Sequence, residues 1–452
     1  MTVRSSGLAA RLGGLTASGK ARVAVAWSLY DFANTIFSFA VVSSAIGLWL
    51  VSDSRFGERD GNFVLSIAVV VSVGLNALVS PILGALSDRG GRRLPFLLFF
   101  TVLCIAPTLL IGGSAPVIGV VLFIVANFAY QAALIYYDAT LKSVSRPETR
   151  GRLSGIGVAV GYGGTIFSGL VLLALGVSVD NRFLVAGVLF AVFAVPIFVF
   201  VRETGPVGRV TWRDVAGSLA QLRTSVQHAR EVPGLLRFLV ARFFYSDAVN
   251  TIIVVMSVVT TRAKGLTDSQ ALIVLLSLTV AAILASFGWG VLVDRLGPRR
   301  TLLIVLSSWA VGLVLGAISL SISGPIGLAL FLVAGAILGS GLGGVQVADR
   351  VLMVRLSPPE RIGEFFGLYG LVGKGSQVVG QLLYGLTLLL FFDSLGVGAY
   401  QLAVLTLLGT MLLGAWILRP VSDRWQGSGD LDVDIHAPPE RLAPMTAPLE
   451  PR

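Results

Sequence analysis

Long apolar runs recur along the entire chain, and they are the feature that most limits its fold. Of the 452 residues, 55% are hydrophobic and only 13% are charged, whereas an ordinary soluble domain has about 25% charged residues. So few charges cannot cover a globule in water. A run of about 20 apolar residues, however, is long enough for a helix to cross a bilayer. The sequence therefore predicts an all-α integral membrane protein.

The apolar runs form two groups of six, which a polar interval separates. The first group lies at 25–51, 62–87, 95–113, 116–141, 154–177 and 182–201. The second group lies at 236–261, 270–293, 301–323, 326–349, 363–392 and 396–418. Twelve transmembrane helices are expected.

The positions of the cations orient these predicted helices. Lys and Arg in short loops stay on the cytoplasmic side of a membrane. With the amino terminus inside, the cations in external loops are only Arg55, Arg59, Arg182, Arg262 and Lys264. Both termini are therefore expected in the cytoplasm. Only four of the 34 basic residues are lysines; this arginine preference suggests a GC-rich bacterial genome, and hence the plasma membrane.

The topology divides the chain into five segments. They are a cytoplasmic amino-terminal segment at 1–24, a six-helix bundle at 25–201, a cytoplasmic linker at 202–235, a second six-helix bundle at 236–418 and a disordered cytoplasmic tail at 419–452. Apolar residues at helical spacing in the linker, beginning at Trp212, are typical of an amphipathic helix on the membrane surface. The proline-rich, aspartate-rich tail cannot bury a core.

The two groups of helices are copies of one another. The motif Asp-x-x-Asn-Thr begins at Asp31 in the first predicted helix and again at Asp247 in the seventh. Gly-x-x-x-Asp-Arg-x-Gly begins at Gly84 after the second helix and at Gly290 after the eighth. After both the fourth and the tenth helix, an aspartate stands nine residues before a proline and twelve residues before an arginine. Three echoes at nearly one offset indicate a parallel duplication, the arrangement of major facilitators.

The loop from Gly84 to Arg93 and its second copy resemble the signature loop of the major facilitator superfamily. The resemblance implies a gate on the cytoplasmic side. A carboxylate at the negative end of a helix needs a cation or another helix amino terminus beside it, and a glycine lets backbones approach. The predicted gating residues are Gly84, Asp88, Arg89, Arg93, Asp294, Arg295 and Arg299. A role in topology alone is the alternative, chiefly for Asp294.

Four further segments carry a finer resemblance. They are Trp27-Ser-Leu-Tyr30-Asp31-Phe-Ala-Asn34, Ala241-Arg242-Phe-Phe-Tyr245-Ser-Asp247-Ala-Val-Asn250-Thr251, Gly151-Arg152-Leu-Ser154-Gly155, and Glu364-Phe-Phe-Gly367-Leu-Tyr369 with Lys374. Together they are similar to the vacuole-effluxer-like branch of the superfamily, which includes an amino-acid effluxer of fungal vacuoles. The resemblance covers about residues 24–420 and implies the major facilitator fold. Gln381 stands where this branch often has a proline, which argues against a family kink in the eleventh helix.

Ionisable side chains inside the predicted helices mark the candidate transport site. A charge at the bilayer centre costs about 2.5–3.5 kcal/mol on insertion scales, so it usually faces the bundle interior and has a function. Spacings of i, i+3 and i+4 place each Asp-x-x-Asn-Thr motif on one helix face. The predicted substrate- or ion-binding residues are Asp31, Asn34, Thr35, Asp247, Asn250, Thr251, Lys374, Tyr30, Tyr245, Asn127, Gln131 and Gln346.

One cation is expected to pair with an aspartate of these motifs. Lys374 or Arg242 is the candidate cation, and protonation or cargo binding would break the pair. The alternative is a permanent polar lock between the halves without cargo contact. Arg242 also lies near the cytoplasmic end of its helix, where snorkelling to the interface would explain it. The single amides have a further alternative, since such groups often only bond a neighbouring helix.

The chain is therefore predicted to be a secondary active transporter, not an enzyme. It is expected to move a small polar metabolite, with amino acids as the first candidates, across the plasma membrane by alternating access. The alternatives are a proton-coupled exporter of hydrophobic compounds and a non-transporting receptor with a transporter-like fold. The spans lack Gly-x-Ser-x-Gly, His-Glu-x-x-His and phosphate-loop motifs, so no cofactor or metal is expected.

The expected partners are the lipid bilayer and a small-molecule substrate, with proton coupling as one option. Although the net charge is +10, the cations are spread between apolar runs. Nucleic-acid binding would need them clustered on one water-exposed face. Nucleic acid is therefore not an expected partner, and no obligate protein partner is evident.

Overall fold

The computed structural model describes residues 17–89, 93–144, 150–203, 223–358 and 361–422. Within these ranges the chain contains helices and no β-strand. In lipid, a backbone has no water to satisfy its N–H and C=O groups, and a helix satisfies them within one segment. The predicted all-α class is confirmed for the described chain.

The helices of the amino-terminal half pack mainly against one another. They are α2 (Ala17–Ile36), the π-helical η1 (Phe37–Ser43), α3 (Ile46–Leu50), α4 (Gly57–Arg89), α5 (Leu94–Ile111), α6 (Pro116–Val144), α7 (Arg150–Ala174) and α8 (Val179–Phe200). α2 packs on α7 and α8, while α6 packs on α4 and α5. The segments α2, η1 and α3 follow one another as a single candidate span, Ala21–Leu50.

The carboxy-terminal half repeats this plan. Its helices are α10 (Leu235–Val258), the π-helical η3 (Val259–Ala263), α11 (Asp268–Leu296), α12 (Pro298–Ser321), α13 (Gly324–Leu356), α14 (Ile362–Gly375), α15 (Gln377–Leu395) and α16 (Val397–Leu418). α13 packs on α11 and α12, and α16 packs on α10 and α12. The first span of each half contains a π-helical segment, η1 or η3, so this local irregularity is duplicated as well.

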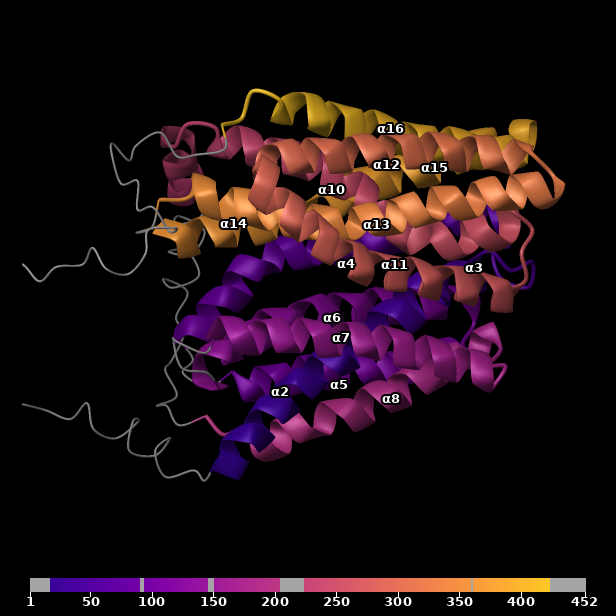
Figure 1. Ribbon diagram of the computed structural model, residues 1–452. Coiled ribbons are helices and arrows are strands. Elements are labelled where there is room, and N and C mark those ends of the chain that lie inside the picture. The colour runs from indigo at the N-terminus through magenta and orange to yellow at the C-terminus, as the bar shows by residue number, and fades with distance from the viewer. Residues whose placement is uncertain (1–16, 90–92, 145–149, 204–222, 359–360, 423–452) are drawn as a thin grey trace, which may run out of the picture.

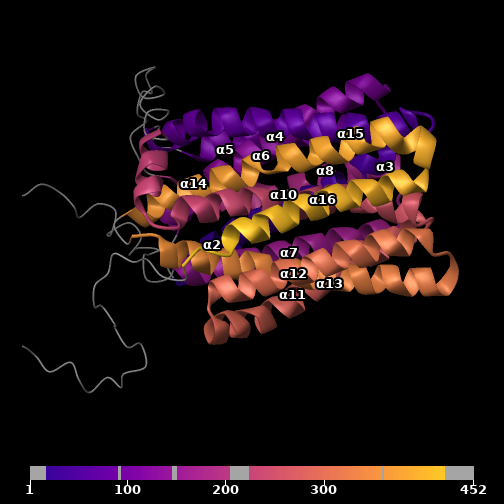
Figure 2. The same ribbon diagram turned by 90° about the horizontal axis from the view of Figure 1, so that it is seen from above.

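In the described part of the chain, eleven helical stretches are long and apolar enough to cross a bilayer. The remaining expected span, at 154–177, falls in α7, where Ala159–Ala174 is apolar but shorter. The two halves lie side by side, indigo to magenta and orange to yellow, and the described chain begins and ends at the same end of the bundle (Figures 1 and 2). This is the arrangement of two bundles expected from the duplication.

Polar bonds join the two halves at the opposite end of the bundle. There α15 lies beside α4. Tyr400 Oη donates to Glu58 Oε1 at 2.8 Å, and Asn62 Nδ2 donates to Tyr400 Oη at 3.0 Å. Tyr384 Oη also donates to Asn62 Oδ1 at 3.2 Å. Because Asn62 and both tyrosine side chains are removed from solvent, these bonds seal that end of the interface.

The eleventh span is divided into two consecutive helices at Ser376, whose dihedral angles, φ −62° and ψ −35°, remain helical. The Ser376 hydroxyl donates to the backbone oxygen of Gly373 at 3.0 Å, the acceptor that the N–H of Gln377 would use in an unbroken helix. Four residues beyond Ser376, the N–H of Gly380 donates to Asp247 Oδ1 of α10 at 2.6 Å. The second part of this span is therefore bonded to α10.

Several predicted features lie outside the described residues. The amino-terminal segment up to residue 16, most of the predicted linker helix and the tail from residue 423 are among them. A helix at 223–231 precedes α10, and His228 Nδ1 of this helix lies 2.9 Å from Glu364 Oε1 at the start of α14. The end of the linker is therefore in contact with the eleventh span.

Candidate functional site

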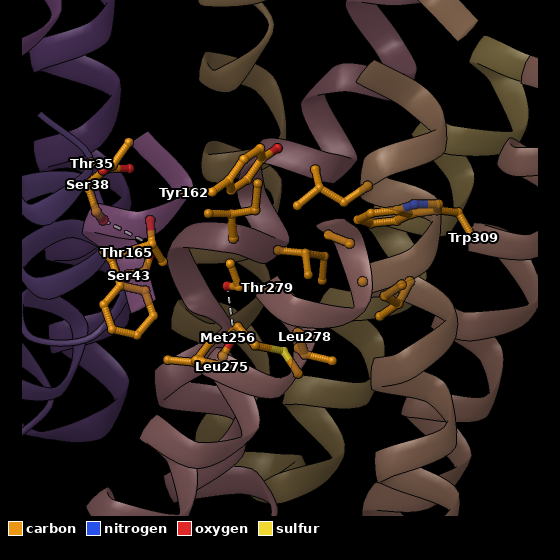
Figure 3. A pocket seen from close by; sticks show the side chains of 17 residues that line it. Thr35, Ser38, Ser43, Tyr162, Thr165, Met256, Leu275, Leu278, Thr279 and Trp309 are labelled. Atoms are coloured by element: carbon orange, nitrogen blue, oxygen red, sulfur yellow. Dashed lines mark hydrogen bonds between the residues drawn. The ribbon is translucent and has the colours of Figure 1, made fainter. Parts of the chain in front are cut away.

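A cavity of about 230 Å³ lies between the two halves. Its amino-terminal wall carries hydroxyl groups from α2, η1 and α7, namely Thr35, Ser38, Ser43, Tyr162 and Thr165. The wall from the other half is mainly apolar and includes Ile252, Met256, Leu275, Leu278, Leu338 and Leu342. Figure 3 shows Thr35, Ser38 and Ser43 on one side and Trp309 on the other. The cavity therefore has one polar and one apolar wall.

Tyr162 connects this cavity to a group of charged side chains. Its Oη donates to Gln346 Oε1 of α13 at 2.8 Å, across the boundary between the halves. It also interacts electrostatically with Asp31 of α2 and Arg350 of α13. Gln346 and Arg350 are both exposed and lie four residues apart, so they share one face of α13.

A second contact across the halves involves Lys374 at the end of α14. Its Nζ lies 3.5 Å from the backbone oxygen of Gln131, and it interacts electrostatically with Asp138 of α6. Asp138 is exposed, and it acts electrostatically on Asp31 as well. The amino-terminal half thus contributes carboxylates to this site, while the other half contributes cations.

The expected pairing of Arg242 was wrong. Its Nε lies 3.2 Å from Asp349 Oδ2 of α13, and its guanidinium lies 3.6 Å from the ring centroid of Tyr369 in α14. Tyr369 Oη donates to Asp349 Oδ1 at 2.8 Å. Only 12% of the Arg242 side chain and 3% of the Asp349 side chain are exposed. Arg242 therefore joins three helices of one half and does not snorkel.

Lys374 does not pair with an aspartate of the two motifs either. Within the described ranges, neither Asp31 nor Asp247 has a cation within 4.0 Å of its carboxylate. The reason lies in the duplication, because Asp138 and Asp349 occupy equivalent positions of the two halves. Arg242 compensates Asp349 locally, whereas Ala26 stands at the position equivalent to Arg242. Asp138 consequently has no such arginine and faces the cations of the other half.

The two Asp-x-x-Asn-Thr motifs have different surroundings. Asp31 is partly exposed, and its Thr35 lines the cavity and donates to the backbone oxygen of Gly161 at 2.5 Å. Asp247 and Thr251 are both fully buried against α15. The duplication is therefore asymmetric at this site, since only the first copy reaches the cavity.

The two tyrosines expected to wall the site lie inside their own halves. Tyr30 is fully buried, and its Oη forms a 2.7 Å hydrogen bond with Thr101 of α5. Tyr245 is fully buried as well. Adjacent helical residues point about 100° apart, so Tyr30 turns towards its own bundle although Asp31 beside it is partly exposed. These two positions are corrected from wall to core.

The amide side chains of the predicted site divide into exposed and buried groups. Gln346 is exposed and accepts from Tyr162, whereas Asn127 Nδ2 donates to Ser72 Oγ of α4 at 2.7 Å and is buried. Asn34 is buried and interacts with Tyr130 of α6. Asn250 is partly buried. Asn127 and Asn34 thus form bonds within the amino-terminal half, which is the structural alternative considered for single amides.

The predicted gating residues are only partly visible. The side chains of Gly84, Asp88 and Arg89 lie outside the described part of the chain. Arg93 Nη1 donates to the backbone oxygen of Ala139 at 3.0 Å, within the amino-terminal half. Arg299 donates to the backbone oxygen of Arg419, within the other half. Asp294 and Arg295 are exposed. The gate therefore remains a prediction.

Sequence reasoning missed Asp138, Arg350 and Tyr162 as site residues. Asp138 was noticed only as part of the duplication. A signal was available, because Arg242 has no counterpart in the first half and leaves Asp138 without a local cation. The positions of Arg350 and Tyr162 depend on which helix faces are opposed across the interface, and the sequence alone does not specify that.

Replacing Gly161 with alanine is expected to disturb the site. A Cβ at this position would lie 2.6 Å from Asp31 Oδ2, closer than real Cβ atoms come. The carboxylate would have to move, so we expect a clear loss of transport with little loss of folded protein. Gly163 is the matched control, because its added Cβ would meet only Phe32, at 3.6 Å. Equal transport rates for the two variants, measured at equal protein in vesicles, would contradict the placement of Asp31.

Fold and site together define a membrane transporter of the major-facilitator type. Residues 55–420 match the model of the family described as vacuole effluxer Atg22 like. The chain belongs to this family, and it is a transporter, not an enzyme.

Known relatives agree with this assignment. The chain is 26% identical over 425 residues to an uncharacterised MFS-type transporter, YxiO of Bacillus subtilis, covering 90% of this chain and 97% of the relative. It is 25% identical over 260 residues to autophagy-related protein 22 of Coccidioides immitis, covering 52% of this chain and 43% of that relative. A variant of the nucleoside transporter NupG shares the fold with a TM-score of 0.69 and 13% identity, covering 89% and 99% of the two chains.

Proposed function

We propose that this transporter moves a zwitterionic metabolite, an amino acid with an apolar side chain, through the cavity between its halves. The supporting observation is the division of charge at the site. Asp31 and Asp138 belong to the first half, and Lys374 and Arg350 belong to the second. An ammonium group fits the carboxylates, while a carboxylate fits the cations.

A zwitterion satisfies both sets of charges at once. A ligand with one charge would leave the opposite set desolvated without a partner, which is costly in a site of low dielectric. The apolar wall at Met256, Leu275 and Leu338 would receive the side chain of the amino acid. The apolar wall would also suit the hydrophobic cargo of an exporter, but such a cargo would leave the charged side chains of the site without partners.

Binding would draw the two halves together. Lys374 and Asp138 interact electrostatically across the interface. A zwitterion between them replaces that interaction with two hydrogen-bonded pairs, so it binds differently to the open and closed arrangements. Such differential affinity is what allows a ligand to shift a conformational equilibrium. Breaking the bonds of Glu58 and Asn62 with Tyr400 would then open the sealed end of the bundle.

The orientation in the membrane belongs to the same proposal. We place both termini in the cytoplasm of the source cell and the sealed end outside, on the plasma membrane, with the five segments that the sequence predicts. The described chain begins and ends at one end of the bundle, and the charge rule for short loops supports this choice.

Counterflow in proteoliposomes tests the cargo directly. Vesicles loaded with leucine should take up labelled leucine, whereas leucinamide and 4-methylpentanoate, which each lack one of the two charges, should not exchange for it. Both analogues retain the apolar side chain, so they isolate the charges. Exchange of an analogue at the rate of leucine would refute the zwitterion model. Transport of ethidium in place of any amino acid would favour the exporter.

A further inference from the structure

The second copy of the Asp-x-x-Asn-Thr motif, which begins at Asp247, contains buried oxygen atoms without hydrogen-bond partners. Asp247 is fully buried, and its Oδ1 accepts the N–H of Gly380 at 2.6 Å. Its Oδ2 has no hydrogen-bond partner, and neither has the hydroxyl of Thr251, which lies one turn further along α10 and is also fully buried. A Cβ built on Gly380 would lie 2.5 Å from Thr251 Oγ1 and 2.7 Å from Asp247 Oδ1. Thr251 Oγ1 and the carboxylate of Asp247 therefore lie beside the same residue of α15.

The protein supplies no positive charge to this carboxylate. On α10 itself, Arg242 is committed to Asp349. On α14, Lys374 interacts with Asp138. The helices α3, η1 and α16, which also pack on α10, contain no charged residue, and α15 contributes Gly380 and the neutral Gln381. The other described elements on α10 carry cations that form no ion pair with Asp247, namely Arg262 in η3, Arg295 in α11, and Arg350 and Arg355 in α13. Within the described chain, Asp247 is thus a buried acid without a cation within 4.0 Å.

A buried carboxylate with one hydrogen bond is unstable unless its charge is neutralised or balanced. From this geometry we infer that Asp247 and Thr251 hold a single monovalent cation, a proton or Na⁺, and that this is the coupling ion of the transporter. One carboxylate balances one positive charge, and the open positions are oxygens, the ligands that hard cations prefer. This inference rests on the proposed transport function and assigns a second site to it.

The eleventh span connects this site to the cargo cavity. Gly380, which binds Asp247, and Lys374, which faces Asp138, lie on either side of the break at Ser376. Arg242 packs on Gly373 and so holds α14 against α10. Cation binding changes the strength of the hydrogen bond from the N–H of Gly380 to Asp247. As a result, α15 moves relative to α14 at Ser376. The position of Lys374 therefore depends on whether the cation site is filled.

The two copies of the motif have different roles in this inference. Asp31 is partly exposed beside the cavity and serves the cargo, whereas Asp247 is sealed and serves the ion. A symporter needs such a separation, because an ion and a cargo that compete for one carboxylate cannot be carried together. The asymmetry of burial is the observation that assigns the roles.

Transport by the Asp247→Asn variant separates the two roles. An amide is neutral, as a cation-loaded carboxylate is, so this variant should exchange leucine in counterflow but fail to accumulate it above its equilibrium level under an imposed ion gradient. Asp31→Asn is the matched control in the other copy and should lose both activities. Accumulation by Asp247→Asn at the wild-type level would overturn the inference. If the wild type exchanges no amino acid at all, the proposed cargo fails instead.

Melting of the purified protein tests the site without any cargo. The wild type should gain thermal stability when NaCl replaces choline chloride, if the ion is Na⁺, or when the pH falls, if it is a proton. Asp247→Asn should lose this response and Asp31→Asn should keep it. Thr251→Val and Gly380→Ala, which leave the acid in place, should weaken the response, whereas Gly375→Ala should not, because nothing lies within 4 Å of its added Cβ. An unchanged response in Asp247→Asn, or no response in the wild type, would refute a cation site.

Discussion

Replacing Arg242 with methionine is expected to reduce the free energy of unfolding by about 3–5 kcal/mol, the usual cost of removing one partner from a buried ion pair. The change leaves Asp349 buried and charged without a cation, because the Asp349 side chain is only 3% exposed. It also removes the guanidinium 3.6 Å from the ring centroid of Tyr369. The loss should appear in thermal unfolding in detergent and in titration with a denaturing detergent.

The double variant Arg242→Met, Asp349→Leu distinguishes this explanation from general damage. Apolar replacement of both partners of a buried pair is often neutral, so the double variant should recover most of the stability and retain counterflow. Arg295→Met on the exposed end of α11 is the control and should shift stability by less than about 0.5 kcal/mol. A double variant as unstable as the single one would show that the pair is not the cause.

Replacing Lys374 with glutamine is expected to lower the rate of leucine counterflow at low concentration by about 100-fold. A hydrogen bond to a charged group contributes up to about 3 kcal/mol, and 1.4 kcal/mol corresponds to a factor of ten. Folding stability should change little, because the hydrogen bond from Lys374 to the backbone oxygen of Gln131 is long, at 3.5 Å. The loss should therefore be confined to transport. Lys374→Arg preserves the charge and should restore part of the rate.

Two controls make the result interpretable. Lys264 donates to the backbone oxygens of Ser319 and Ile322 at the other end of the bundle, so Lys264→Gln should leave counterflow unchanged. Combining Lys374→Gln with Asp138→Asn should cost less than the two single losses together, because both residues belong to one interaction. Wild-type counterflow in Lys374→Gln would remove this lysine from the cargo site.

The membrane fold was accessible from the sequence because it depends on local and periodic properties. Apolar length decides whether a helix can span lipid, and three echoes of motif revealed the duplication without any knowledge of packing. The same reasoning recognised Asp31 and Asp247 as equivalent and Lys374 as a buried cation. It also selected Thr35, which lines the cavity, and Gln346, which accepts a hydrogen bond from Tyr162 of the cavity wall.

Partners across the bundle were not accessible in this way. The aspartate that binds Arg242 is 107 positions away, at Asp349, whereas the sequence favoured an aspartate of the repeated Asp-x-x-Asn-Thr motif. The bond from the N–H of Gly380 to Asp247 was missed for the same reason, since the carboxylate lies on α10 and not on the eleventh span. Contacts of this kind depend on which faces of distant helices meet.

The sequence by itself determined the apolar helices, the duplication and the pair of equivalent acids, because these follow from composition, spacing and internal comparison. Only the tertiary structure decided that the two acids differ. Asp31 lies beside an open cavity, while Gly380 closes over Asp247. Identical motifs acquire different burial, and hence different chemistry, from the helices packed against them. Burial is a property of the neighbours, which no local pattern records.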